Sequence, residues 1–294
     1  MPIRLACSTI CFRTSPIEVA LEEIKRFGFS TIDLAVIPGF CDHFDAARQS
    51  GAEREDFVAL VRRSGFAVPT ITAVPGHFNA PEASPSLILN AGVQNLKLAA
   101  LLGAEALNVH CGLPTGDLHD RRQFKAQALV QAQGLKRLAQ EAARLGLNLN
   151  VEAPHRNGLC RTLEEAEFLL AEIDEPNVNF LLDVTHVQAG KARPEDAARR
   201  FAGRLGYAHL RDGKGENIFL TPGDGDIDFR AFFGALEQIG YGGWCALELE
   251  GTGETLPERR ANLRRALQHL FTQAEQITGL ELTAAPDHDS PLNA

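Results

Sequence analysis

Several features are scarce or missing in this sequence, and each absence narrows what the chain can be. Lysine and arginine number 29 against 38 aspartates and glutamates, which leaves a formal net charge of −9. Because phosphate binding usually requires a basic surface, this balance argues against a nucleic-acid partner. The six cysteines include no CxxC pair and mostly stand in apolar stretches, which predicts reduced thiols in the core.

Long apolar runs are also missing. The apolar start, IRLACSTICF, is interrupted by Arg4 and leads directly into a helix start, so it does not resemble a signal peptide. No run reaches the length that crosses a bilayer. No linker, low-complexity segment or sequence repeat divides the chain. We therefore expect a cytoplasmic protein without a membrane partner, with one domain at residues 1–278 and a flexible tail at residues 279–294.

What the sequence does contain is a regular alternation of strand-like and helix-like segments. The strand candidates are residues 5–12, 31–37, 67–74, 106–110, 147–152, 178–187, 207–210 and 244–249. Helical patterns separate them, one of which begins with a capping box at Thr162. An open doubly wound sheet usually has a glycine-rich turn after its first strand, and CSTICFRTSP contains none. The series predicts an α/β fold, a single (β/α)₈ barrel.

Four of the expected strands end in residues that bind divalent metals. They are Glu152 in NLNVEAPH, Asp183 in VNFLLDVTHVQ, His209 in YAHLRD and Glu248 in WCALELEG. In such barrels the strand ends and the loops after them meet at one mouth. An uncompensated buried carboxylate costs several kcal/mol, so Asp183 should have a cation or strong donors beside it. Three carboxylates and one histidine suit one divalent cation, Mn²⁺ or Mg²⁺ first, with Co²⁺ and Zn²⁺ also compatible.

Further residues near these strand ends are candidates for substrate contacts, each with a plainer alternative. His186 stands three residues after Asp183, and His110 and His77 follow the fourth and third strands; all three could instead be satisfied core histidines. Arg211 and Lys214 follow His209 and could meet an anionic group or simply be surface charges. Separate expectations concern single residues: Cys111 as core or pocket wall, Asp228 as a helix cap, and Asp33 as an ordinary solvated or capping acid.

The four strand ends, in the contexts NVEAPH, LLDVTHV, AHLRDGKG and ALELEG, with PGDGDIDF before the last, resemble a known family. They look like the xylose-isomerase-like barrels of the sugar phosphate isomerase/epimerase group, which includes ketose 3-epimerases, inosose dehydratases and hydroxypyruvate isomerases. The resemblance covers about residues 5–271.

The resemblance implies one divalent metal, commonly Mn²⁺, held by Glu152, Asp183, His209 and Glu248. It implies that Glu152 and Glu248 also move the substrate proton and that His186 contacts substrate oxygens. The expected activity is isomerisation or epimerisation of a small sugar or keto-sugar through an enediolate, with His186, His110, Arg211 and Lys214 as the substrate-binding residues.

Alternatives to this activity stay open. The same metal site would serve a dehydratase of an inosose or dehydroshikimate. An abasic-site endonuclease of the endonuclease IV type is more distant: His77, His110 and His186 resemble its extra ligands. However, its Asp-x-His motif appears here as Asp226-Ile227-Asp228, and no basic, aromatic-rich strip is present. A non-catalytic binding protein is the least favoured, and assembly into homo-oligomers is left open.

Overall fold

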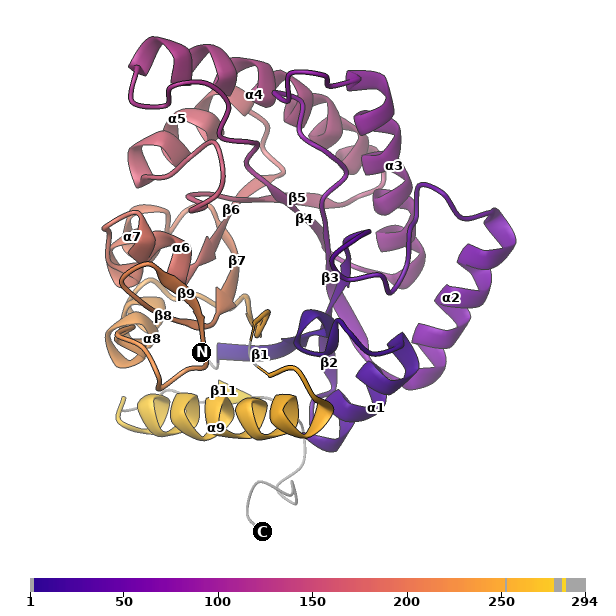
Figure 1. Cartoon of the computed structure of the whole chain (residues 1–294), viewed down its shortest axis with the longest axis vertical. Helices are drawn as coiled ribbons and strands as arrows, with labels where there is room; N and C mark the ends of the chain where they lie inside the picture. Colours follow the sequence, from indigo (N-terminus) through magenta and orange to yellow (C-terminus); the bar gives the residue numbers. More distant parts are fainter. Residues whose placement is uncertain (1–2, 252, 278–281, 284–294) are drawn as a thin grey trace.

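The strands close into a parallel barrel surrounded by helices (Figure 1). The structure is a computed structural model that describes residues 3–251, 253–277 and 282–283. The barrel strands are β1 (Ile3–Ser8), β2 (Thr31–Val36), β3 (Ala67–Ala73), β4 (Ala106–His110), β5 (Asn148–Glu152), β6 (Val178–Asp183), β7 (Leu205–Leu210) and β10 (Trp244–Leu247).

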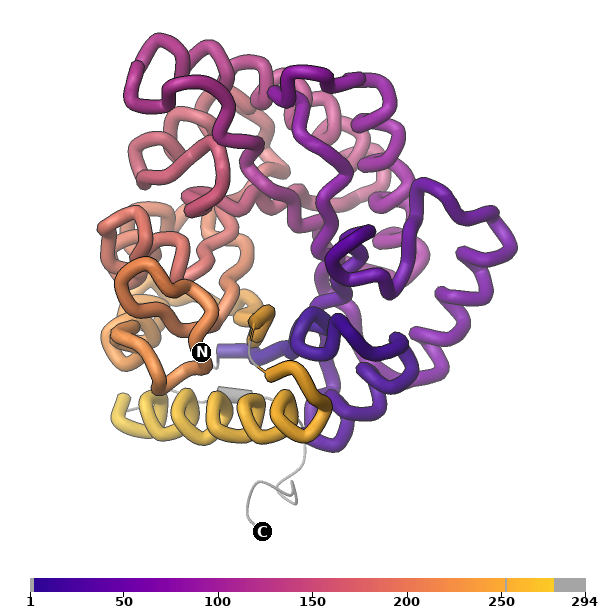
Figure 2. The backbone as a smooth tube through the Cα atoms, in the orientation of Figure 1, coloured from indigo at the N-terminus to yellow at the C-terminus, as the bar shows by residue number. Residues whose placement is uncertain are grey.

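Sheet order follows chain order, from β1 through β7, and the last strand β10 pairs with both β7 and β1. In Figure 2 the indigo start of the chain accordingly lies beside the orange and yellow end, and the ring is complete. All of these pairings are parallel, so the carboxyl ends of the strands open on one mouth. The predicted (β/α)₈ barrel is confirmed.

The helices form the outer layer (Figure 1). They are η1 (Thr9–Phe12), α1 (Ile17–Arg26), α2 (Gly51–Ser64), α3 (Pro85–Leu102), α4 (Arg121–Arg144), α5 (Leu163–Ile173), α6 (Val184–Ala189), α7 (Pro194–Arg200), α8 (Phe229–Gln238) and α9 (Leu256–Glu275). The short strands β8 (Asp212–Lys214) and β9 (Asn217–Leu220) form a hairpin after β7, and β11 (Leu282–Thr283) pairs with β1.

Two predicted helix starts are confirmed by their hydrogen bonds. Thr162 and Glu165 form the capping box of α5, and Asp228 caps α8 by accepting a hydrogen bond from the Ala231 N–H (2.8 Å). These side chains satisfy backbone N–H groups that have no partner within the helix. The α5 helix follows β5, which ends in Glu152, and the α8 helix precedes β10, which Glu248 directly follows.

The apolar core lies mainly between the strands and the helices. The largest cluster of buried apolar residues joins residues of all eight barrel strands to the surrounding helices. Inside the barrel the apolar cluster is small: Ala6, Leu181, Tyr207 and Ala246, with Trp244 packed against it. Within the described residues, no helix is both long enough and apolar enough to cross a bilayer.

Two strands are shorter than predicted. The first strand ends at Ser8, whose hydroxyl accepts a hydrogen bond from the Ile10 N–H, and the one-turn helix η1 replaces residues 9–12. The sixth strand ends at Asp183 and not at residue 187, because Asp183 caps the helix α6. The predicted flexible tail at residues 279–294 lies outside the described residues except for Leu282–Thr283, which form β11.

The contact between Phe78 and α4 provides a test of the packing around the barrel. A Cβ added to Gly134 would lie 2.0 Å from Phe78 Cγ, and Phe78 is buried. We expect Gly134→Ala to lower the free energy of unfolding by about 1–3 kcal/mol through overpacking, although alanine is the better helix former. Thermal unfolding measures this loss of stability as a lower Tm. The control is Gly51→Ala, which should not lower Tm because nothing lies within 4 Å of the added Cβ. Equal Tm values for both variants would contradict this packing.

Candidate metal centre and active site

Four side chains from the ends of β5, β6, β7 and β10 meet at the barrel mouth. One ligand atom from each of Glu152, Asp183, His209 and Glu248 lies within 4.8 Å of the others. His209 Nδ1 is 3.2 Å from a Glu248 oxygen and 3.7 Å from a Glu152 oxygen. The pairing register places Asp183 directly beside His209 on the neighbouring strand. The sequence-predicted ligand set is therefore brought together in space.

The donor set fits a divalent cation. His209 is fully buried, and neither of its ring nitrogens has a hydrogen-bond partner in the described part of the chain. Burial raises the pKa of Glu152 and raises that of Glu248 well above its usual range. Carboxylates crowded in this way repel one another unless a positive charge lies between them. Three carboxylates and an imidazole would supply the oxygen and nitrogen ligands that Mn²⁺, Mg²⁺, Co²⁺ or Zn²⁺ accept.

Asp183 has two distinct sets of partners. Its Oδ1 accepts hydrogen bonds from the Thr185 N–H (2.8 Å), the Thr185 hydroxyl (2.7 Å) and the His186 N–H (3.0 Å). Its Oδ2 accepts one from Arg211 Nε at 2.8 Å. Burial alone would raise the pKa of Asp183, but the charge of Arg211 and the other groups around the carboxylate, the Thr185 hydrogen bond among them, together outweigh it, and the pKa lies below its ordinary value. The carboxylate is thus ionised and held in one orientation.

Arg211 is a buried charge beside the ligand group. Its guanidinium lies 2.7 Å from Asp183 and Glu250 and 3.8 Å from Glu248. Another contact places it 2.8 Å from His186 Nε2. Arg211, named from the sequence as a substrate contact, is thus already bound by carboxylates of the protein. Glu250 was not singled out from the sequence, although it follows Glu248 by two residues on the same chain segment.

Lys214, the other cation named from the sequence, has a different environment. Its side chain is 66% exposed, and its ammonium lies 3.3 Å from Asp226. It belongs to the β8–β9 hairpin and has no ion pair with the ligand group among the described residues. Within the described residues the ion pair of Lys214 is with this surface acid and not with the ligand group.

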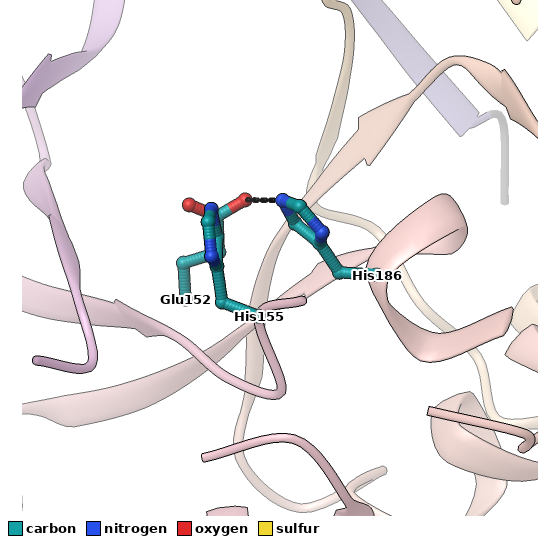
Figure 3. Close-up of side chains that lie close together, drawn as sticks. All are labelled: Glu152, His155 and His186. Atoms are coloured by element: carbon teal, nitrogen blue, oxygen red, sulfur yellow. Dashed lines mark ion pairs between the residues drawn. The ribbon is translucent and has the colours of Figure 1, made fainter. Parts of the chain in front are cut away.

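A row of histidine rings borders the ligand group. Ring centroids are 5.0 Å apart for His77 and His110, 4.0 Å for His110 and His155, and 3.7 Å for His155 and His186. Figure 3 shows His186 facing Glu152, 3.9 Å away, with His155 beside the carboxylate. Burial lowers the pKa of all four rings, that of His186 to about 3. The row is therefore neutral at physiological pH.

His155 was not singled out from the sequence, although a usable signal was present. It follows Glu152 by three residues, the same spacing that separates Asp183 from His186. The structure brings Glu152, His155 and His186 close enough for a second ligand group that shares Glu152 with the first. His186 itself lies on α6 and not in an extended segment, and its backbone N–H donates to Asp183.

The loop after β7 depends on Asp212, which the sequence analysis also missed. Its carboxylate accepts hydrogen bonds from the N–H groups of Gly213 (2.8 Å), Gly223 (2.9 Å), Gly225 (3.0 Å) and Ile227 (3.1 Å). A single buried side chain thus folds the segment PGDGDIDF against the strand that carries His209. Cys111 is fully buried, consistent with a thiol in the core.

Asp33 corrects a prediction. It is not a solvated acid but fully buried on β2, where the hydroxyls of Thr70 and Thr72 donate to it. Its Oδ2 lies 3.6 Å from His209 Nε2. These hydroxyls belong to β3, so nothing near residue 33 in the sequence indicates them.

A cavity of about 210 Å³ opens beside the ligand group. Acidic and imidazole groups in its lining are Glu152, Glu248, Glu250, His110 and His155. Apolar side chains also line it: Ile10, Ile37, Phe40, Ala73, Val74, Val109 and Leu181. Thr72 and Asn108 also line it, and none of the described residues in the lining is a lysine or arginine. A cavity of this size suits a small molecule.

Comparison with known proteins finds relatives that are sugar epimerases and dehydratases. Over 188 residues it is 29% identical to the L-ribulose 3-epimerase of Methylomonas sp. (strain DH-1), a match that covers 63% of each chain. Over 135 residues it is 31% identical to the inosose dehydratase of Geobacillus thermodenitrificans (strain NG80-2), covering 40% of this chain and 45% of that one. Both matches span less than two thirds of the relative.

A solved structure shares the fold over most of its length. The crystal structure of the IolI protein with a zinc atom superposes with a TM-score of 0.76 at 17% identity, covering 94% of this chain and all of that one. The family model described as xylose isomerase-like TIM barrel matches residues 21–273. With closed barrel, strand-end ligand group and family match in agreement, the chain belongs to the xylose isomerase-like TIM barrel family.

Proposed function

We propose that this protein is a cytoplasmic, divalent-metal-dependent enzyme that epimerises or isomerises a small keto-sugar. The observation that carries the proposal is the meeting of Glu152, Asp183, His209 and Glu248 within 4.8 Å at the barrel mouth, beside a small cavity. The similarity to an L-ribulose 3-epimerase supports this class of reaction. Mn²⁺ is the cation we propose first, because the set is mostly carboxylate; the zinc of the IolI structure keeps Zn²⁺ as a candidate.

In this proposal Glu152 and Glu248 exchange the substrate's proton. Glu152 ends β5 and Glu248 directly follows β10, with β6 and β7 between these two strands, and both residues line the cavity. Burial raises the pKa of both carboxyls, which brings them closer to the basicity that a proton-transfer group needs at neutral pH. A divalent cation, when bound, supplies the Lewis acidity that stabilises the negative charge of an enediolate.

The position at which the proton returns decides the product. One glutamate takes the proton from the carbon next to the carbonyl. Return by the other glutamate to the opposite face of the same carbon gives the epimer, and return to the neighbouring carbon gives the aldose–ketose isomer. His110 and His155 line the same cavity as neutral rings and are available to bind substrate hydroxyls, with His186 next in the row.

The cavity favours a substrate without phosphate. Its charged lining consists of Glu152, Glu248 and Glu250, and the nearby Arg211 is already paired with carboxylates. Lys214 is paired with Asp226 on the surface. A phosphate placed here would meet like charges without a free cation to pair with it. The same acidity and small volume disfavour a polynucleotide, and with it the abasic-site endonuclease alternative.

A dehydratase is the second candidate, favoured by the 31% identity to an inosose dehydratase. It would begin with the same proton removal and then expel the β-hydroxyl, so the product carries one water less. Incubating the protein with Mn²⁺ in D₂O with ketoses, their phosphate esters, inososes and dehydroshikimate separates the candidates. Deuterium in a ketose or its epimer supports the main proposal, and loss of water from the product supports the second.

Metal binding should stabilise the protein in a pH-dependent manner. Burial alone would lower the pKa of His209, but Glu248 and Asp33 hold it well above its usual range, so a proton competes with the metal. In the metal-free protein this raised pKa adds stability below the unfolded value of about 6.5, and that stability is lost as pH rises through the folded pKa. We therefore expect the Tm increase caused by Mn²⁺ to be larger at pH 8 than at pH 5.5.

Scanning fluorimetry of chelator-treated protein with and without MnCl₂ measures this increase. At a hundredfold excess over Kd the expected stabilisation is about 2.7 kcal/mol. Glu248→Gln should remove most of it, whereas Glu105→Gln, at an exposed position, should retain it. A Tm increase that is absent, or that is larger at pH 5.5, would contradict the metal site.

The two glutamates are tested by proton exchange. At saturating Mn²⁺, Glu152→Gln and Glu248→Gln should each slow exchange of the substrate's α-proton with D₂O by roughly 10²–10⁴-fold, because an amide cannot accept the proton. NMR measures the exchange, and metal content is determined in parallel because both residues are ligand candidates. Glu105→Gln is again the control. Wild-type exchange rates in both glutamine variants would rule out the assignment.

A further inference from the structure

The interior of the barrel contains a belt of polar side chains where such barrels usually carry branched apolar residues. We use the name polar belt for Asp33 on β2, Thr70 and Thr72 on β3, Asn108 on β4, Asn150 on β5 and Asn179 on β6. All are buried except Asn179, which is half-buried. A buried polar row of this length requires an explanation, because apolar residues would fill the same space without the cost of removing polar groups from water.

The hydrogen bonds of the polar belt all run toward Asp33. The Asn179 amide N–H donates to Asn150 (3.3 Å), Asn150 donates to Asn108 (2.8 Å), and Asn108 donates to the Thr72 hydroxyl (3.0 Å). Thr72 donates in turn to Asp33 Oδ1 (2.8 Å), and Thr70 donates to the same oxygen (3.0 Å). Each group donates a hydrogen bond to the next, so the carboxylate of Asp33 is the final acceptor of the row.

Asp33 also faces His209. Asp33 Oδ2, which the Thr72 hydroxyl reaches at 3.0 Å, lies 3.6 Å from His209 Nε2. This contact is slightly longer than a hydrogen bond and is the only ion pair of Asp33 among the described residues. The opposite nitrogen, Nδ1, faces Glu248 and Glu152 at 3.2 and 3.7 Å. A proton on Nε2 directed at Asp33 leaves the lone pair of Nδ1 free on the side of the ligand group. A carboxylate behind a ligating histidine fixes its tautomer and ring orientation and raises its basicity.

The strand that carries His209 is shaped to lie against the polar belt. Gly206 stands three residues before His209 on β7, and a Cβ there would lie 2.6 Å from Asn150 Oδ1 and 2.6 Å from Asn179 Cβ. The missing side chain allows β7 to approach the belt closely. The polar belt thus spans β2 to β6. Gly206 of β7 packs against its Asn150–Asn179 end, and His209 of the same strand faces its Asp33 end.

We propose that Asp33 is a positioning residue: it holds His209 in the orientation and tautomer that direct Nδ1 at the bound cation, and Thr70 and Thr72 of the polar belt hold Asp33. The inference rests on the metal site of the proposed function. It adds a residue from β2, outside the four ligand-bearing strands, and gives the two threonines that bind it a role in metal affinity.

The test compares Mn²⁺ affinity with fold stability. In Asp33→Asn, which keeps the shape of the side chain but removes its charge, the Kd for Mn²⁺ should rise by about 10–100-fold. Free Mn²⁺ is measured by its EPR signal, and the absorption spectrum of Co²⁺-loaded protein reports the histidine ligand. Thermal unfolding of the metal-free proteins shows whether the fold is retained. Asn179→Ser is the matched control: it removes the far bond of the belt without touching His209, so Kd should remain that of wild type.

The outcomes separate the two levels of the proposal. Wild-type Kd and Co²⁺ spectrum in a folded Asp33→Asn variant would overturn the role of Asp33 and leave the metal site intact, as would an equal loss of affinity in Asn179→Ser. If Asp33→Asn does not fold, the Mn²⁺ affinities of Thr70→Val and Thr72→Val test the role of Asp33 instead. Each removes a donor to Asp33 and should raise Kd more than Asn179→Ser does; equal Kd values would overturn the role. Absence of Mn²⁺ binding in the wild type would overturn the proposed function itself.

Discussion

The structure depends most on the crowding of acidic side chains in a buried space. Glu152, Asp183 and Glu248 converge around His209, and burial opposes the ionisation of each carboxyl. Arg211 compensates part of this charge by pairing with Asp183 and Glu250. Even with Arg211 paired, the cluster carries more negative than positive charge. A divalent cation is the compensation that matches the donors, and the same unbalanced carboxylates are the groups able to move a proton.

The parallel barrel makes this crowding possible. Each ligand stands at the end of its own strand or one residue from it, so backbone pairing, which places Asp183 beside His209, fixes the spacing of the ligands. Loops then complete the site: Asp183 starts α6 and so places His186, and Asp212 gathers the glycine-rich loop after β7. Inside the barrel, below the mouth, the residues of the polar belt stand where apolar side chains are usual. We propose that they help to orient His209 through Asp33.

Much of this was predictable from the sequence because periodicity and strand ends are local signals. The alternation of apolar runs and helical patterns indicated the barrel, and acidic or histidine residues at the ends of four runs indicated the ligand group. Residues 184–187 were wrongly predicted as strand because the sequence there still contains apolar residues. The Asp183 side chain caps a helix at this point, so the residues form α6. Asp33 and Glu250 were missed because their partners, Thr70, Thr72 and Arg211, lie more than thirty residues away along the chain.

The central claim is that one divalent cation sits among the ends of β5, β6, β7 and β10. Anomalous scattering from a crystal soaked in MnCl₂, recorded at the manganese absorption edge, tests it most directly. We expect one strong peak at bonding distance, about 2.0–2.3 Å, from oxygens of Glu152, Asp183 and Glu248 and from Nδ1 of His209. A peak elsewhere, or these side chains arranged around water without manganese, would contradict it.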